Sequence, residues 1–378
     1  PCCPVAKQCG GCQLQHLSYA AQLAYKTKEV QDDLERIGGI TGVTVRPAIG
    51  MDAPWRYRNK AQFPVGQAKG RLLCRFYAKR SHRIVDTKQC FLQNERNDAI
   101  VALVRDFLNE FQISLYDEET HTGLVRHILT RIGRSSGEVM VCIVLNGKRL
   151  PHSEVLVERL QRIEGMVSIV LNVNREKTNV ILGRKIITLW GKDTITDSLD
   201  DIEFEISPLS FYQVNPVQTE VLYKKAVELA DLKGDETVLD LYCGIGTIFS
   251  FSSQGRQGRY SAWRLCPKPL RTRGKTRSET VSRTQPLPSA RRRRSSPSCI
   301  GRRALRQMWL WLTRPERAVM HACWKRFSKL PPKRSCMFPV TCDTRTGFGC
   351  ACGWRLPYTR GAACRPVPSY KSCRDGCL

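Results

Sequence analysis

Apolar residues recur at helical spacing over residues 18–37, and this pattern predicts an amphipathic helix. Two glycines follow directly and would end that helix. Its apolar face would consist of Leu23, Val30, Leu34 and Ile37. The residues before the helix, 3–12, have no such period and form a cysteine-dense loop.

Short apolar runs dominate residues 42–206 and predict a mixed α/β domain with several short strands. The clearest runs cover residues 139–145 and 167–173. Both are continuous, as expected of strands that are buried on both faces.

A second helix is predicted to begin at Asn215-Pro216, with Asn as its N-cap and Pro at its first position, and to run to Gly234. The run at residues 237–241 then predicts a buried strand that leads into a glycine turn. The apolar face of the helix would consist of Val221, Leu222, Ala226 and Leu229.

The net charge of +27 would suggest a nucleic-acid partner, but the charge is confined to one part of the chain. Residues 249–378 hold 23 Arg and 6 Lys against four acidic residues, a net charge of +25, which leaves +2 for residues 1–248. Apolar periodicity also ends at Ile248. A Rossmann-like domain cannot end after one strand, because a lone strand and helix bury too little surface to fold. We therefore expect residues 249–378 to be a disordered basic tail that trypsin removes at once.

The composition also predicts the cellular compartment of the protein. No stretch is apolar and long enough to span a membrane, and the first residues do not form a signal peptide, so we predict a cytoplasmic protein without a membrane partner. The chain starts at Pro1, which suggests a fragment. Ten of the 18 cysteines lie after residue 248 without a repeated spacing, and the others predict a metal site in a reducing compartment.

That metal site is predicted from Cys3, Cys9 and Cys12, which follow the pattern C-x5-C-x2-C with two glycines between the last two cysteines. Three thiolates need a fourth ligand for a closed site, and Cys90, at the end of a D-T-K-Q-C segment, is the candidate. Soft thiolates select zinc or an iron–sulfur cluster, and the spacing alone favours neither. Unligated buried cysteines are the alternative.

Other candidate residues are interpreted as structural. Cys2 adjoins Cys3 but falls outside the spacing, whereas Cys74 and Cys142 sit in apolar runs and are predicted core residues. His127, next to Arg126, is also interpreted as structural rather than catalytic.

The predicted strand leads into D-L-Y-C-G-I-G-T at residues 240–247. Glycine turns of this kind let a cofactor approach the backbone at the carboxyl end of a strand, although a G-x-G alone is weak support. Here it is preceded by S-P-L-S-F-Y-Q-V-N at residues 207–215.

Together with the C-x5-C-x2-C loop, the D-x-K-Q-C around Cys90 and the W-R-Y-R-N-K of residues 55–60, these segments make the chain resemble the RNA uracil-C5 methyltransferases of ribosomal RNA and tRNA. The resemblance covers residues 3–248. The cysteines of that family hold a 4Fe-4S cluster, so the resemblance favours iron–sulfur over zinc. Many relatives carry a small N-terminal β-barrel RNA-binding domain before the cluster, which we interpret this chain as lacking.

The resemblance also implies S-adenosyl-L-methionine (SAM) as cofactor and RNA as substrate. It implies that Arg58 and Lys60 belong to the RNA-binding face, with a solvated charge pair as the alternative. The implied SAM contacts are Gln213, Tyr242 and Thr247, beside Gly244 and Gly246.

The chemistry of that family needs residues that the chain does not contain as written. A cysteine thiolate must add to carbon 6 of uracil, because carbon 5 is otherwise too weak a nucleophile to attack a sulfonium methyl group. A carboxylate then removes the proton from carbon 5, and the uracil must be splayed out of its stack to be reached. An acid for the SAM ribose, a D-P-P-R-K-G segment, an S-C-[DN]-P nucleophile and a late general base are all missing after the glycine turn.

Shifted codons can supply these segments. Read from the third base, residues 260–275 allow F-G-V-E-I with the ribose-binding acid, residues 307–322 allow D-V-V-V-A-D-P-P-R-K-G, and residues 335–341 allow V-Y-V-S-C-D. From Thr341 the second-base frame allows P-A-T-L-A-R-D-L, and later D-L-F-P-H-T-K-A-V-E-T-V over residues 365–376. We infer that residues 249–378 are an out-of-frame translation, with a genuine arginine-rich tail as the alternative.

The sequence thus predicts an α/β protein with four parts: an iron–sulfur loop and helix at 1–41, a central RNA-binding domain at 42–206, the start of a Rossmann-like SAM domain at 207–248, and the tail at 249–378. The expected function is methylation of carbon 5 of a uridine, in 23S ribosomal RNA, by a monomer. A tRNA uracil-C5 methyltransferase and a non-catalytic iron–sulfur RNA-binding protein are the alternatives.

Overall fold

The computed structural model describes residues 2–68, 70–231, 237–240, 245–248, 259–262, 308–312, 336–342, 349–351 and 354–355. By their contacts, these residues form two compact units. The first unit contains residues 2–23 and 49–217, and the second contains residues 24–48 and the described residues from 218 onward.

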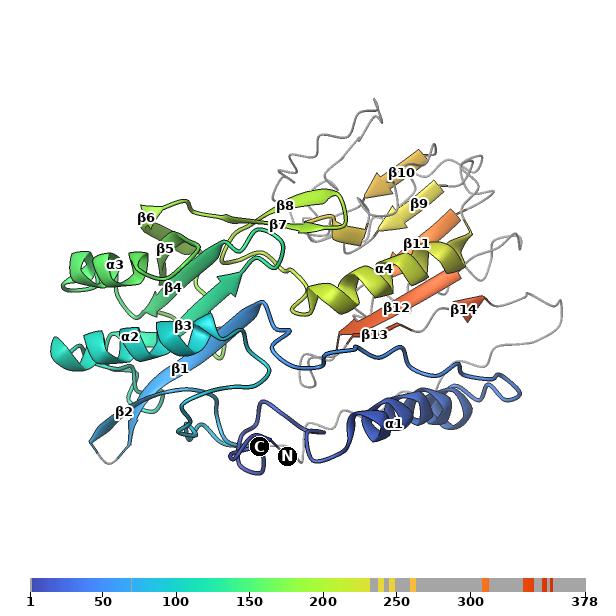
Figure 1. Ribbon diagram of the computed structural model, residues 1–378, viewed down its shortest axis with the longest axis horizontal. Coiled ribbons are helices and arrows are strands. Elements are labelled where there is room, and N and C mark those ends of the chain that lie inside the picture. The colour runs from blue at the N-terminus through green and yellow to red at the C-terminus, as the bar shows by residue number, and fades with distance from the viewer. Residues whose placement is uncertain are drawn as a thin grey trace, which may run out of the picture. The chain divides into compact units, whose positions relative to one another are not determined.

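The first unit is built on a mixed six-stranded sheet with the order β2-β1-β3-β4-β5-β6. Neighbouring strands are antiparallel except β4 and β5, which are parallel and joined through α3. Figure 1 shows α2 and α3 side by side on one face of this sheet. The elements are β1 (Lys60–Ala68), β2 (Arg71–Cys74), α2 (Arg96–Glu110), β3 (Val125–Ile132), β4 (Val139–Leu145), α3 (Ser153–Gln161), β5 (Met166–Val173) and β6 (Lys185–Gly191).

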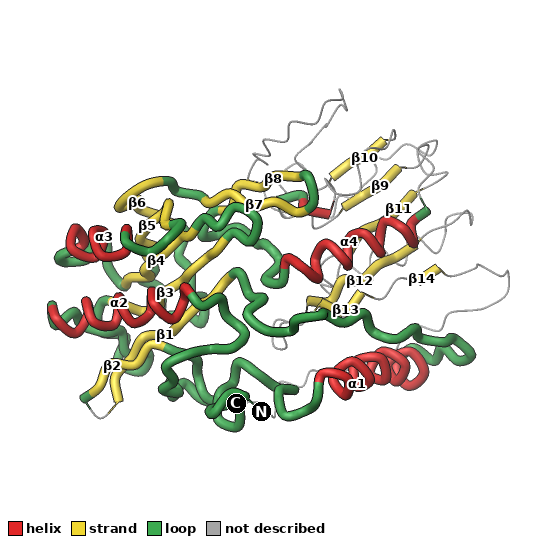
Figure 2. The backbone as a smooth tube through the Cα atoms, in the orientation of Figure 1, coloured by secondary structure: helices red, strands yellow, loops and turns green. Residues whose placement is uncertain are grey.

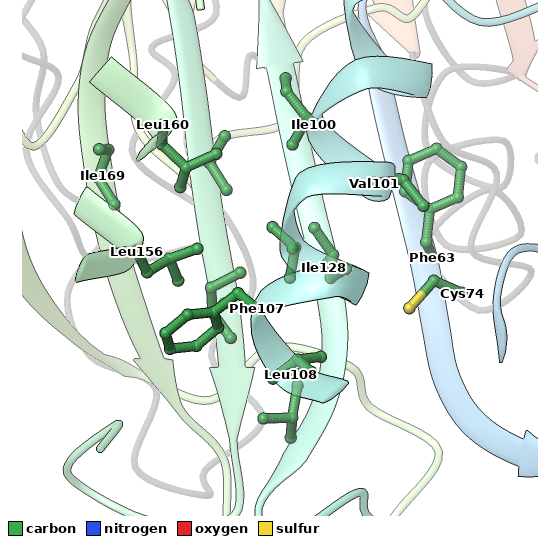
Figure 3. Close-up of a cluster of buried hydrophobic side chains, with 14 of the residues drawn as sticks. Phe63, Cys74, Ile100, Val101, Phe107, Leu108, Ile128, Leu156, Leu160 and Ile169 are labelled. Carbon is green, nitrogen blue, oxygen red and sulfur yellow. The ribbon is translucent and has the colours of Figure 1, made fainter. Parts of the chain in front are cut away.

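The main core lies between the two helices and the sheet (Figure 3). Phe107 of α2, Leu156 of α3 and Ile128 of β3 are all fully buried there. The other face of the sheet carries a smaller apolar cluster of Leu129 and Cys142, together with Val170. Strand β4 is buried at every position, which explains why its sequence is continuously apolar.

The first unit also contains a two-stranded hairpin and long loops. Strands β7 (Ile195–Leu199) and β8 (Ile202–Ile206) pair in antiparallel register. Figure 2 shows that loops, rather than helices or strands, make up most of the N-terminal cysteine segment and the stretch between β2 and α2. These loops position the candidate metal centre.

The first predicted helix is α1 (Tyr19–Asp32), which continues as a π-helical turn, η1 (Asp33–Ile37). Leu34 is buried as predicted, but Ile37 is 51% exposed, so its assignment to the apolar face was wrong. A π-helical turn contains more residues than an α-helical one, and it therefore rotates the residues after Asp33 away from the face set by the α-helix.

The second predicted helix is α4 (Pro216–Ala230), which ends before the predicted Gly234. Its buried face also differs, because Leu229 is 37% exposed. The buried positions are spaced as one helical stripe, formed by Tyr223, Ala226, Val227 and Ala230. Ala226 is thus buried as predicted, whereas Tyr223, Val227 and Ala230 are buried at positions outside the predicted face and Leu229 is not buried.

The second unit contains a sheet with the order β10-β9-β11-β12-β13, and β14 also pairs with β12. Strands β10, β9, β11 and β12 are mutually parallel, as in Rossmann-like sheets. The bounds are β9 (Thr237–Asp240), β10 (Arg259–Ala262), β11 (Met308–Leu312), β12 (Cys336–Cys342), β13 (Gly349–Ala351) and β14 (Trp354–Arg355). The last five strands fall within residues 249–378, and the remainder of that range lies outside the described residues. The predicted disorder of that range stays a prediction.

Within the described part of the chain, no helix has the length and hydropathy that crossing a membrane requires.

Candidate metal centre and cofactor turn

The four predicted ligands, Cys3, Cys9, Cys12 and Cys90, line one small pocket of the first unit. The rest of the pocket wall is mostly apolar and includes Val5, Ala6, Phe76, Phe91 and Leu92. The structure therefore brings a thiol from residue 90 to three thiols from the first twelve residues. Soft ligands in an apolar surrounding form the environment that a sulfur-bound metal group requires.

The N-terminal cysteine loop is fixed by backbone hydrogen bonds. The Cys9 amide donates to the Val5 carbonyl at 2.9 Å, and the Gly10 amide donates to the Tyr77 carbonyl at 2.8 Å. A Cβ atom on Gly10 would lie 3.0 Å from that carbonyl oxygen, so the close approach favours glycine. The next amide, that of Gly11, points back and donates to Cys9 Sγ at 3.4 Å.

Cys90 is positioned by the segment that carries the W-R-Y-R-N-K motif. Arg56 donates from its side chain to the Cys90 carbonyl at 2.7 Å and forms an ion pair of 3.2 Å with Asp98, in the first turn of α2. The Arg58 amide donates to the Leu92 carbonyl at 3.0 Å. The amides of Leu92 and Gln93 in turn donate to the Cys90 thiol. These N–H to sulfur bonds favour a thiolate at this position.

Burial nonetheless favours the neutral form of three of these thiols, Cys9, Cys12 and Cys90, in the absence of a metal. Burial, the largest cause, raises the pKa of Cys12 to about 12, and the neighbouring Cys90 and Cys9 raise it further. Burial likewise raises the pKa of Cys9 and of Cys90, while the amide hydrogen bonds lower them in part. A cation or cluster in the pocket would offset both the burial and the mutual repulsion of the thiolates.

The pocket does not have the closed geometry of a loaded site. Within the described residues, no group of three or more His, Cys, Asp or Glu side chains is drawn together tightly enough to hold a metal ion. The donor set itself still fits an iron–sulfur cluster, because it offers four thiols, N–H donors to two of the sulfurs and an apolar wall.

The other front cysteines that the structure describes lie as predicted. Cys74 and Cys142 are buried in the apolar cores on the two faces of the sheet, and burial raises the pKa of each to about 12. Cys2 is exposed and does not line the pocket. His127 is buried in β3, where burial lowers its pKa to about 4, and this location agrees with a structural role.

Arg58 and Lys60 flank the start of β1, and both are partly buried rather than fully solvated. Lys60 pairs in register with Arg131 of β3. Burial, and then the charges of Arg131 and Arg58, lower the pKa of Lys60 to about 7. Burial and two nearby arginines thus disfavour the charged form of Lys60, whereas a fully solvated surface charge pair would not lower its pKa in this way.

We expect Lys60→Met to stabilise the fold, and the gain to depend on pH. Between pH 10.5 and pH 7 the unfolded chain binds a proton at Lys60 that the folded chain does not, so wild-type stability falls as the pH falls through this range. The advantage of the variant should therefore grow by at most about 1.4 kcal/mol per pH unit and level off below pH 7. The difference in unfolding free energy between variant and wild type is measured from urea midpoints at pH 6 to 10. Lys148→Met, at an exposed lysine, is the control, and equal pH profiles would contradict the assignment.

The predicted cofactor residues fall in both units. Gln213, in the loop before α4, accepts a hydrogen bond at its carbonyl from the Asn59 side chain at 2.9 Å. In the second unit, the Thr247 hydroxyl lies 2.8 Å from the hydroxyl of Tyr223 on α4. Gly246 has a φ of 85°, the left-handed conformation that favours glycine in a turn. Tyr242 and Gly244 lie outside the described residues.

Two supporting residues were not identified from the sequence. Asn59 lies within the W-R-Y-R-N-K motif, but its partner is a backbone carbonyl 154 residues away. Tyr223 was part of the predicted helix but not of its predicted apolar face. Neither role has a sequence signal other than the motif or helix that contains it.

No family model matches the chain, but curated proteins with similar sequences were found. The chain is 56% identical over 253 residues to an uncharacterized RNA methyltransferase of Halalkalibacterium halodurans, covering 67% of the chain and 55% of that protein. It is 51% identical over 255 residues to one of Clostridium tetani, with the same coverage of each. The chain thus spans about half the length of the curated relatives it matches.

Among solved structures, the fold is similar to that of Pyrococcus abyssi tRNA (uracil-54, C5)-methyltransferase in complex with S-adenosyl-L-homocysteine. The TM-score is 0.62 at 22% identity, over 89% of this chain and 77% of that chain. This likeness shows a mixed α/β fold with a Rossmann-like part.

Proposed function

We propose that the chain encodes a SAM-dependent RNA methyltransferase that modifies carbon 5 of a uridine through a covalent cysteine–uracil adduct. The observation that carries the proposal is 56% identity, over 253 residues, to a protein named RNA methyltransferase. The F-Y-Q-V-N and D-L-Y-C-G-I-G-T segments and the likeness in fold to a uracil-C5 methyltransferase support it.

The described residues would hold the cofactor as follows. SAM, when bound, supplies the methyl group. Gln213 would contact it from a loop that Asn59 fixes through two bonds, one from its side chain to the Gln213 carbonyl and one from its amide to the Val214 carbonyl at 3.0 Å. Thr247 would contact it from the glycine turn, with its hydroxyl oriented by Tyr223. Tyr242, Gly244 and Gly246 complete the proposed set.

The cysteine pocket would hold a 4Fe-4S cluster on Cys3, Cys9, Cys12 and Cys90. Its contribution is structural, because the four thiols join the N-terminal loop to the segment before α2. Arg58 and Lys60, at the start of β1, would belong to the RNA-binding face, where phosphate contacts position the substrate, and Lys60 would carry its full charge only below its pKa of about 7.

The chain as written would bind cofactor and RNA incompletely and transfer no methyl group, because the nucleophile and the general base are missing from it. The shifted codons allow the segments F-G-V-E-I, D-V-V-V-A and V-Y-V-S-C near strands β10, β11 and β12, which lie at 259–262, 308–312 and 336–342. A non-catalytic iron–sulfur RNA-binding protein is the second candidate, and it describes what this chain could do without those groups.

The proposed substrate is 23S ribosomal RNA, acted on by a cytoplasmic monomer, and tRNA is the alternative. The cysteine site favours ribosomal RNA, since tRNA enzymes of the resembled family commonly lack the cluster loop. The test uses a chain rebuilt in the shifted frames, with labelled SAM and transcripts of 23S RNA and of tRNA. Label should enter 23S RNA. Label in tRNA alone would reverse the assignment, and label in neither would refute the proposed function.

A further inference from the structure

The segment between β2 and α2 contains a short hairpin, residues 76–85, which we call the basic hairpin. The Ala78 amide donates to the Arg83 carbonyl at 2.7 Å, and the Val85 amide donates to the Phe76 carbonyl at 2.9 Å. Its base is anchored, because Val85 is buried and the ring of Phe76 packs against Phe63 of the core at 5.1 Å. The tip therefore projects from a fixed base.

The tip of the basic hairpin, residues 79–83, is exposed and strongly positive. Lys79, Arg80 and Arg83 are all exposed, and none forms an ion pair with any residue that the structure describes. The tip has no acidic residue and no large apolar side chain. Lys7 is exposed on the adjoining cysteine loop, where the Lys79 amide donates to the Gln8 carbonyl at 3.2 Å. The charges are thus available to an anionic partner.

Two contacts hold the basic hairpin in place. On one side, Cys9 forms a β-bridge with Ala78, next to the hydrogen bond between Gly10 and Tyr77. On the other side, Glu118 accepts a hydrogen bond from the Tyr77 hydroxyl at 3.0 Å and contacts the ring of His82. The order of the tip therefore depends on the order of the cysteine loop.

We propose that the basic hairpin is a second RNA contact, which binds the phosphate backbone and is positioned by the cysteine loop. This inference rests on the proposed function for the identity of the polyanion. A run of cations without apolar side chains suits phosphates in solution better than a membrane, where apolar insertion accompanies charge. The contact would carry no base specificity, because phosphates report no sequence. It gives the cysteine site a function in RNA binding: loss of the cluster would loosen the hairpin.

The test must measure RNA contact at individual residues of the hairpin. Overall RNA binding is not informative, because residues 249–378 carry a net charge of +25 and would hold RNA by themselves. The full chain, with its cluster, is acetylated at lysine with and without a 23S RNA fragment, and each lysine is quantified by mass spectrometry. Lys79 and Lys7 should be protected several-fold, whereas Lys148, at another exposed Lys-Arg pair, should not. Equal protection of all three would overturn the proposal. So would protection by anionic lipid vesicles but not by RNA.

Two variants complete the test. K79Q/R80Q should reduce the slope of log affinity against log salt by about 1.4, from two lost phosphate contacts to single-stranded RNA, whereas the matched K148Q/R149Q should leave the slope unchanged. Iron content should be the same in both. Arg80 has a φ of 54°, so R80G should keep the fold and still lose protection at Lys79. If a rebuilt chain methylates RNA while Lys79 stays unprotected, the hairpin proposal alone fails.

Discussion

Rebuilding residues 249–378 in the third-base frame, and then in the second-base frame from Thr341, is expected to turn an inactive chain into an active methyltransferase. The written chain retains Gln213 and Thr247 but lacks the cysteine that must add to carbon 6 of uracil. Without that covalent step carbon 5 is too weak a nucleophile, and loss of a nucleophile alone costs about 10⁴–10⁶ in rate in well-studied enzymes. The chain as written should therefore show no activity above background.

The measurement follows the proton that the reaction displaces. Methylation replaces the hydrogen on carbon 5, so RNA made with uridine tritiated at that carbon should release tritium to water only with the rebuilt chain. The control is the rebuilt chain with the cysteine of its S-C-D segment changed to alanine, which should return to background. Tritium release by the chain as written would contradict both the frame argument and the assignment of the missing groups.

The strands of the first unit could be predicted where burial alone determines the sequence. Strand β4 was predicted at its observed bounds because it is buried on both faces and tolerates only apolar residues. Strand β6 was not singled out, because none of its positions is buried and its partly buried and exposed positions do not alternate strictly. The mixed order of the sheet depends on pairings between distant segments, such as β1 with β3, which a single sequence does not encode locally.

Helix faces were less predictable than helix positions. In α4 the leucines were expected inside, but Tyr223 and Ala230 are buried and Leu229 is partly exposed. Hydrophobicity ranks leucine above alanine, whereas close packing admits the small residue. In α1 the error at Ile37 has a different cause, the π-helical turn, which breaks the 3.6-residue period on which the prediction depended.

The candidate metal site was predictable because thiols are rare, and their spacing carries information that charges do not. The pattern C-x5-C-x2-C and a distant fourth cysteine selected the four side chains that line one pocket. The basic hairpin beside that pocket was not predicted, since Lys79 and Arg80 in a sequence look like any solvated charges. The structure ties these charges to the cysteine loop through the bridge between Cys9 and Ala78 and through the hydrogen bond from the Lys79 amide to the Gln8 carbonyl.

Cys90→Ser is expected to abolish metal binding, whereas Cys74→Ser is expected to leave it unchanged. Cys90 lines the pocket with the three N-terminal cysteines, and its thiol receives hydrogen bonds from the Leu92 and Gln93 amides, which favour a thiolate. Cys74 is equally a buried thiol with a raised pKa, but it lies in the apolar core away from the pocket. The two substitutions are chemically identical and differ only in location.

The full chain purified without oxygen should be brown and contain about four iron and four sulfide per chain, as a 4Fe-4S cluster requires. Cys90→Ser should be colourless, and Cys74→Ser should match the wild type in both metal and sulfide. Cys142→Ser is a second control at a core thiol, in case the first substitution disturbs folding. Stoichiometric zinc without iron would refute the cluster and leave a zinc site on the same ligands. Iron retained by Cys90→Ser would remove residue 90 from the ligand set. The three N-terminal thiols need a fourth ligand to close the site, and that ligand would then have to be another residue.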